Sequence, residues 1–445
     1  MRNRIAFTTL ALALAAGAGP LGAQEAPVPL TLSGAVTLAA DTAPAVRLAE
    51  LRTAEAEARV RQSRGGLLPT VGVAAGAVTQ TRNLASFGLQ LDIPGAPPSS
   101  DKIGPFETYD ARLRATAPIL DPAGVVRVRA TRQLAAGTRS DQDAAAEAAG
   151  QRAALAYLRA ARAAATVSAR DADVRIAQQL VDLARAQLDR GVAAGIDLTR
   201  AETQLATARG ALALARNQRA QADVELARAL GVAPTTHFEV RDTLSAEVAH
   251  PTVAAEENAA LAAALEHRPE LKAERSRQEA AKLNARAIRA ERLPRLEAVA
   301  DYGWNGAEID KSFPTYTVGV QVSLPVFDGM RREARTEEQE LVAREAGVRA
   351  DDLEEQVAAE VRSALLDVSS GQEQQAIAAE RLRLAEAELS QAQERFANGI
   401  AGNIEVINAQ GSLLRARDAV IEAQYATAAA RVGLARATGT AQEIR

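Results

Sequence analysis

The sequence contains no cysteine among its 445 residues, which excludes disulfides, thiolate metal sites and thiol nucleophiles. Histidine occurs only at positions 237, 250 and 267, without the spacing of a metal site. P-loops and G-x-S-x-G nucleophile elbows are also missing. We therefore expect no enzyme, no metal and no cofactor. The net charge of −4 is spread along the whole length, so nucleic acid is not an expected partner either.

Long apolar stretches are confined to the N-terminus. Two arginines precede an apolar stretch from Ile5 to Ala16, and small residues follow to Ala23, which is typical of a secretory signal peptide. Beyond it, no stretch reaches the roughly 18 to 20 apolar residues that a membrane-spanning helix needs. The sequence therefore predicts that residues 1–23 are removed on export, and that the mature chain enters a membrane only as strands.

Proline is missing from the interior of two long segments, Pro122–Arg190 and Gly329–Asn398, which are rich in Ala, Leu, Glu, Arg and Gln. At about 1.5 Å per residue, each segment predicts a helix about 100 Å long. Apolar residues step by three and four along both, as in the seam of a coiled coil. Shorter helices are expected after the long ones, at about 196–230 and 404–437, and before them, at about 33–64 and 256–292.

The chain is an internal duplication. The stretch RGVAAGIDLTRAETQL (190–205) returns 208 residues later as NGIAGNIEVINAQGSL (398–413), and near the start of each copy Pro44 pairs with Pro269 at an offset of 225. Within each copy, we expect the opening and last helices to lie end to end beside the long helix. The predicted divisions are a first repeat at 24–231, a connecting segment at 232–254, a second repeat at 255–439 and a C-terminal tail at 440–445.

Between the helices, the period of the hydrophobic pattern changes from about 3.6 to 2. Apolar and polar residues alternate in YDARLRATAP (109–118), RLEAVADYGWN (295–305) and PTYTVGVQVSLP (314–325), and more weakly after Pro69. Runs of about 9 to 11 residues are long enough for a tilted strand to cross an outer membrane. We therefore expect two β-hairpins, at about 70–118 and 295–326, although alternation alone also fits a half-buried soluble sheet.

The scarce aromatic residues favour the membrane over the soluble sheet. Most of those beyond the signal peptide lie in or beside the two hairpins, near the ends where the aromatic girdles of a membrane barrel would lie. The predicted girdle consists of Tyr109, Tyr302, Trp304, Phe313, Tyr316 and Phe327, and Phe87 and Phe106 belong to the same hairpins.

Four strands are too few to close a barrel, and an open edge cannot lie in lipid because its backbone N–H and C=O groups would lack partners. Other chains must therefore complete the sheet. Three copies would supply twelve strands, enough to enclose an open lumen. The alternative is an exported periplasmic coiled-coil scaffold or stalk without a pore.

These features together resemble the outer membrane efflux protein family, whose best-known member is the TolC channel. The resemblance rests on the duplication, the Leu-Pro pairs at 68–69 and 293–294, LPVFDG at 324–329 with its altered counterpart APILDP at 117–122, and both glycine turns. It implies a mainly α-helical fold with a membrane β-barrel portion. Three protomers would each supply four strands to a twelve-stranded barrel in the outer membrane, continuous with a long periplasmic α-helical barrel of coiled coils.

The resemblance also implies a function and partners. The homotrimer would be the exit duct of a tripartite efflux or type I secretion system, held in outer membrane lipid and fed by a periplasmic adaptor and an inner membrane pump. Drug efflux, metal efflux and protein secretion remain alternatives. The two glycine turns would then be the periplasmic tips that dock to the adaptor, through Gly191, Gly195, Gly399 and Gly402.

Polar residues beside the tip turns are the expected entrance residues. Asp197 and Glu405 match acidic positions of such channels, but they also open the returning helices, where a carboxylate suits the helix dipole, so helix capping is an equal interpretation. Asn408 lies one turn after Glu405, at a position that is often acidic in relatives. Ala401 stands where some relatives place a basic residue that latches the closed state.

Overall fold

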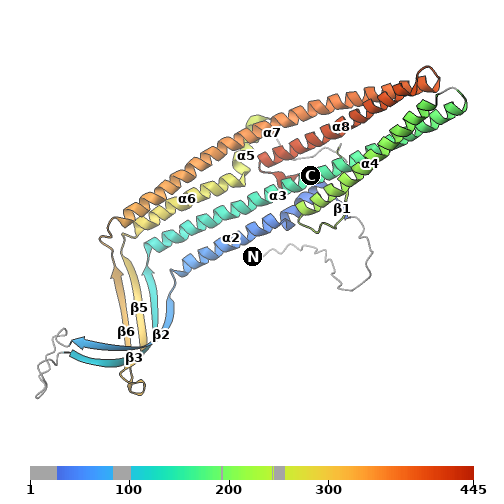
Figure 1. Ribbon diagram of the computed structural model, residues 1–445. Coiled ribbons are helices and arrows are strands. Elements are labelled where there is room, and N and C mark those ends of the chain that lie inside the picture. Colours follow the sequence, from blue (N-terminus) through green and yellow to red (C-terminus); the bar gives the residue numbers. More distant parts are fainter. Residues whose placement is uncertain (1–27, 84–101, 192–193, 243, 245–255, 445) are drawn as a thin grey trace, which may run out of the picture.

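The computed structural model describes residues 28–83, 102–191, 194–242, 244 and 256–444 as one elongated protomer, with a sheet at one end and two helical hairpin tips at the other (Figure 1). The predicted signal peptide with its cleavage site after Ala23, Phe87 and His250 lie outside the described residues. None of the helices in the described ranges combines enough length with enough apolar character to cross a bilayer. The prediction of a mainly helical fold with four long strands is confirmed.

Two very long helices form the body. α3 (Pro122–Asp189) has 68 residues and α7 (Arg331–Ala397) has 67, so each is about 100 Å long. Each begins beside an aspartate that accepts a backbone N–H. Asp121 accepts from the N–H of Gly124 at 2.8 Å, and Asp328 accepts from that of Arg332 at 3.2 Å. The two aspartates lie 207 residues apart, one less than the offset of 208 between the tips, because Asp121 is itself the N-cap of α3 whereas Asp328 lies two residues before Met330, the N-cap of α7. The last residues of the two helices, Asp189 and Ala397, correspond at the offset of 208, and positions within these uninterrupted helices are compared at that offset.

The opening segment of each repeat is two helices, where the sequence analysis predicted one. α1 (Leu32–Thr42) and α2 (Pro44–Gly65) open the first repeat, and α5 (Glu257–His267) and α6 (Pro269–Ala290) open the second. A proline disfavours helical geometry in the residue before it, and accordingly Ala43 and Arg268 have ψ angles of 132° and 114°. Pro44 and Pro269 then begin the next helix, where their missing N–H costs nothing.

The returning helices end at these breaks. α4 (Gly195–Ala229) reaches the junction of α1 and α2, where Thr42 Oγ1 donates to the carbonyl oxygen of Leu230 at 2.5 Å. α8 (Asn403–Ala437) reaches the junction of α5 and α6 in the same way. The expected end-to-end layout is therefore present: α2 and α4 lie along α3, and α6 and α8 lie between α3 and α7 (Figure 1). α7 and the line of α2 and α4 form the two outer edges.

The strands form one antiparallel sheet in the order β2-β3-β5-β6. The hairpin of β2 (Thr70–Asn83) and β3 (Lys102–Leu120) is joined through β3 to the hairpin of β5 (Arg295–Gly306) and β6 (Phe313–Ser323). With 19 residues, β3 is longer than the predicted run because it pairs with strands on both sides. β2 and β6 each have a single neighbour among the described strands, so both outer edges of the sheet are open.

A compact cluster covers the middle of α3. It contains α1, the parallel pair β1 (Val28–Leu30) and β4 (Phe238–Val240), and the short 3-10 helix η3 (Ala441–Glu443). The hydroxyl group of Tyr157, which is 1% exposed, lies 2.9 Å from Asp242 Oδ2 and 3.1 Å from the carbonyl oxygen of Leu30. These contacts join β1, and Asp242 shortly after β4, to the helical body. A second 3-10 turn, η2 (Ile309–Lys311), connects β5 and β6.

Candidate functional site

The two hairpin tips are closed by glycines in the left-handed conformation. Gly191 and Gly399 have φ angles of 74° and 68°. In the second tip, the N–H of Ile400 donates to the carbonyl oxygen of Arg395 at 2.9 Å, which is the long bond of a Schellman motif. A Cβ atom at either glycine would meet no other atom within 4 Å. The expected left-handed turns are therefore present, and glycine is needed there for its backbone freedom alone.

The other two tip glycines have no such requirement. Gly195 is the first residue of α4, and Gly402 is the N-cap of α8 with φ −77°. Neither has a neighbour within 4 Å of an added Cβ. Their smallness leaves the surface of both tips open.

The predicted entrance residues occupy the first turns of the returning helices. Asp197 is the third residue of α4 and lies 3.8 Å from Arg200. Glu405 is the third residue of α8, and Asn408 lies exposed one turn further along. The N-caps themselves are Ala194 and Gly402, and neither side chain caps its helix. The capping interpretation therefore reduces to a favourable position of the carboxylates near the helix dipole.

Glu405 has a partner that the sequence analysis missed. Arg395 near the end of α7 reaches across the hairpin, with Nε 3.0 Å and Nη2 3.5 Å from the two carboxylate oxygens of Glu405. Both side chains are about half exposed, at 53% and 46%. The pair could have been found by folding the sequence about Gly399, because residues on either side of a tight turn face each other. Any negative potential at this position is therefore partly compensated within the protomer.

Two buried amides fasten the tips to each other. Asn403, which is fully buried, donates from Nδ2 to the carbonyl oxygen of Asp197 at 2.6 Å. Gln187 donates from Nε2 to the carbonyl oxygen of Phe396 at 2.9 Å. Around them, both hairpins contribute to one hydrophobic cluster, which includes Leu389 and Leu413 from the second and Val181 from the first. The two tips of a protomer are thus packed as one unit.

The sheet has an apolar face and a polar face. Leu113, Tyr302 and Tyr316 stand opposite one another across three strands, and neighbouring rungs of the same face carry mainly alanine and valine. On the opposite face, Arg112 donates to Asp110 from Nε at 2.6 Å and to Asp301 from Nη1 at 2.9 Å. Such alternation is what a strand with lipid on one side and water on the other requires.

Most of the predicted girdle residues share the apolar face. The rings of Tyr302 and Trp304 pack edge to face with centroids 5.5 Å apart, and by strand register Tyr109 and Tyr316 lie on the same side. Phe327 follows β6 at the helical end and is 79% exposed. Phe313 differs from the expectation, because it stands opposite Asn305 on the polar face. It therefore does not share a face with the others.

Within the described residues, no group of acidic or histidine side chains is arranged to hold a metal ion. The comparisons with known proteins concern the whole architecture. A family model described as outer membrane efflux protein matches residues 35–232 and 260–440, which takes in both repeats. The outer membrane efflux protein BepC of Brucella suis biovar 1 (strain 1330) is 24% identical over 277 residues. This alignment spans 61% of the present chain but only 58% of BepC.

Solved structures share the fold. The outer membrane channel MtrE of Neisseria gonorrhoeae, in its open state, has 19% identity and a TM-score of 0.75, with 92% of this chain and 89% of that chain covered. The outer membrane protein VceC of Vibrio cholerae has 21% identity and a TM-score of 0.72, with coverages of 92% and 96%. The matching family consists of outer membrane transport proteins, so the predictions of a non-enzymatic protein and of an outer membrane location are confirmed. Matched along both of its repeats, the chain belongs to the outer membrane efflux protein family.

Proposed function

We propose that three copies of the chain form the outer membrane exit duct of a tripartite efflux or secretion system. The observation that carries this proposal is the pair of open edges on each protomer. β6 continues into α7 along one side, and β2 follows α2 along the other. An edge strand in lipid needs a partner for its N–H and C=O groups, and β2 of a second copy is the natural partner for β6.

The helical edges are complementary in charge. α7 carries sixteen acidic and nine basic residues, whereas α2 and α4 together carry ten basic and seven acidic residues. Both edges also expose large apolar side chains: Leu341, Val348, Leu366, Ile377 and Leu384 on α7, and Leu48, Leu51, Leu214 and Val224 on the opposite edge. A head-to-tail contact between two different surfaces closes into a ring when the rotation fits. Three copies would give a ring of twelve strands.

Within this ring, the polar face of the sheet would line the lumen, and the long helices would continue the duct through the periplasm. The paired tips at Gly191 and Gly399 would form the periplasmic end, where an adaptor and an inner membrane pump would dock. Glu405 and Asn408 would stand near that entrance. Drugs, metal ions and proteins remain alternative substrates, because the described surfaces carry no group that selects among them.

The test is the mass of the mature protein, extracted from outer membranes into a mild detergent, together with its conductance in a planar bilayer. We expect three copies and a passive, water-filled pore. A stable monomer that dissolves without detergent would refute the duct and leave the periplasmic scaffold as the alternative.

A further inference from the structure

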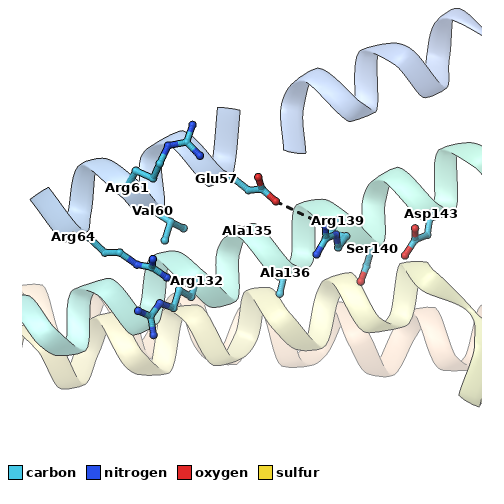
Figure 2. Close-up of a pocket in the computed structure, with 10 residues that line it drawn as sticks. All are labelled: Glu57, Val60, Arg61, Arg64, Arg132, Ala135, Ala136, Arg139, Ser140 and Asp143. Atoms are coloured by element: carbon cyan, nitrogen blue, oxygen red, sulfur yellow. Dashed lines mark ion pairs between the residues drawn. The ribbon is translucent and has the colours of Figure 1, made fainter. Parts of the chain in front are cut away.

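A basic groove lies between α2 and α3, on the part of the helical body nearest the sheet. It has a volume of 660 Å³ and is lined by four arginines, Arg61, Arg64, Arg132 and Arg139, with Glu57, Asp143, Ser140 and three apolar side chains. Figure 2 shows Arg64 of α2 and Arg132 of α3 turned toward each other, whereas Arg61 points away from α3. Glu57 lies 3.8 Å from Arg139. Among the described residues, no carboxylate pairs with Arg61, Arg64 or Arg132.

The second repeat shows what these positions look like when their charges are satisfied. The offset of 225 makes Arg64 of α2 equivalent to Arg289 of α6, and the offset of 208 makes Arg132 of α3 equivalent to Glu340 of α7. In the second repeat, Arg289 and Glu340 form an ion pair. In the first repeat, the same two places hold two arginines. The place that holds an ion pair in the second repeat thus holds two like charges in the first repeat.

Two guanidinium groups that line one groove repel each other unless an anion lies between them. Arginine also presents several N–H donors in a planar fork that fits phosphate oxygens. The two carboxylates of the groove do not offset its four arginines, so an excess of positive charge remains. The groove therefore suits a compact anion with several acceptor oxygens better than a neutral or cationic ligand.

The groove stays accessible in the proposed ring. At about 100° per residue, Leu48 and Leu51 lie on nearly the opposite side of α2 from Arg64, so a second copy packed on these leucines would leave the groove open. The groove instead shares the face of α3 that carries the cluster of α1 and η3, since Glu147, one turn beyond Asp143, binds the N–H of Ala441. The lipid source proposed below requires this face to be the outer surface of the proposed duct.

The groove is also close to the membrane end of the helices. Arg64 is the penultimate residue of α2, and β2 begins at Thr70. Arg132 lies ten residues after Pro122, about 15 Å along α3 from its start. We propose that this groove binds a phosphate group, and that the headgroup of an anionic phospholipid in the inner leaflet of the outer membrane is its source. The assignment of the source rests on the proposed membrane position, whereas the affinity for phosphate does not.

The test uses the full-length mature protein in nanodiscs that contain equal amounts of phosphatidylglycerol and phosphatidylcholine. Native mass spectrometry counts the lipids retained per protomer, and inorganic phosphate is added in a parallel series. We expect retention of phosphatidylglycerol over phosphatidylcholine, and competition by phosphate. Arg132→Glu copies the ion pair of the second repeat into the first, so it should preserve the fold and weaken the retention by about tenfold or more, because charge-assisted hydrogen bonds are lost.

Two further variants make the experiment decisive. Arg286→Glu makes the same change of charge on an exposed part of α6, outside the groove and away from the two helical edges of the proposed ring, and we expect it to behave as the wild type. Glu340→Arg should create a second phosphate site in the second repeat and raise the number of retained anionic lipids. If Arg132→Glu and Arg286→Glu retain equal amounts of phosphatidylglycerol, the groove is not the site and the proposal fails.

The remaining outcomes separate the possible sources and the two proposals. Binding of inorganic phosphate that Arg132→Glu abolishes, without enrichment of phosphatidylglycerol, would support the phosphate site and refute the lipid source. Absence of both effects would refute phosphate binding and leave an acidic protein segment as the alternative occupant of the groove. The same spectra report the number of protomers, so failure of the proposed trimer is recognised independently of the lipid count.

Discussion

Gly231 and Gly399 offer a sharp comparison because their backbones are alike and their surroundings differ. Their φ angles are 69° and 68°. Alanine at either position carries the cost of the left-handed conformation, about 1 to 2 kcal/mol. At Gly399 nothing lies within 4 Å of an added Cβ, whereas at Gly231 the Cβ would lie 2.6 Å from the carbonyl oxygen of Thr42 and 3.1 Å from Ala43 Cα. Overpacking of this kind adds about 1 to 3 kcal/mol.

We therefore expect Gly231→Ala to lower the free energy of unfolding by about 2 to 5 kcal/mol, and Gly399→Ala by about 1 to 2 kcal/mol. The assay is denaturation in detergent, followed by helical circular dichroism. Gly210→Ala is the matched control, because Gly210 lies inside α4 with no neighbour within 4 Å, and alanine there should stabilise the helix by up to about 1 kcal/mol. Equal losses at positions 231 and 399 would show that the junction between α4 and the break at Pro44 is not tightly packed.

Substitutions at Gly399 and Gly231 should rank in the opposite order when export is measured in place of stability. Gly399→Val, and likewise Gly191→Val, distorts only a tip turn, so we expect impaired export with normal assembly and membrane insertion. Gly231→Ala should leave the tips intact and affect export only through the amount of folded protein. Export that survives both tip substitutions would refute the assignment of these turns as the docking surface.

The remaining predictions concern two carboxylates. In planar bilayers, the pore should prefer cations, and trivalent cations added on the periplasmic side should block it. Glu405→Gln should weaken this block, and Asn408→Asp should tighten it. Arg395→Gln should also tighten it, because Arg395 pairs with Glu405; equal block in all four proteins would place Glu405 away from the constriction. Burial raises the pKa of Glu147, which accepts from the N–H of Ala441 at 2.6 Å. The folded protein then holds the proton of Glu147 more tightly than the unfolded chain does. Glu147 therefore contributes most to the free energy of unfolding below its pKa in the unfolded chain, and this contribution declines as the pH rises through its pKa in the folded protein. Thermal melts between weakly acidic and neutral pH should show this decline in the wild type and not in Glu147→Gln, and parallel profiles would refute it.

The sequence predicted the elements well because their signals are local. The periods of 3.6 and 2 identified the long helices and the strands, and the positive φ of Gly191 and Gly399 followed from their places at helix ends. The breaks before Pro44 and Pro269 were missed, although both prolines marked the repeat. Their effect depends on the residue that precedes them, and the helical pattern continues on both sides.

The contacts of the tips were less accessible from the sequence. Asn403, which the sequence analysis did not single out, follows Gly402 at a helix start, and its side chain donates to the carbonyl oxygen of Asp197 in the other hairpin. This contact depends on how α4 and α8 pack, which no single segment encodes. The pair of Arg395 and Glu405, in contrast, joins the two helices of one hairpin, and folding the sequence about Gly399 would have found it. The face of Phe313 likewise follows from simple alternation with Tyr316, and the aromatic character of the residue obscured it.

The two open edges of the protomer have a consequence for genetics. In the proposed ring, β6 of each protomer pairs with β2 of the next. A protomer with a damaged β6 edge still offers an intact β2 edge, so it assembles with two normal protomers and leaves one of the three β6–β2 contacts unpaired. When damaged and normal copies are made in equal amounts, only about one ring in eight contains three normal copies. Substitutions confined to β6 or β2, such as proline within either strand, should therefore be dominant over the normal gene, whereas substitutions that prevent a copy from folding should be recessive.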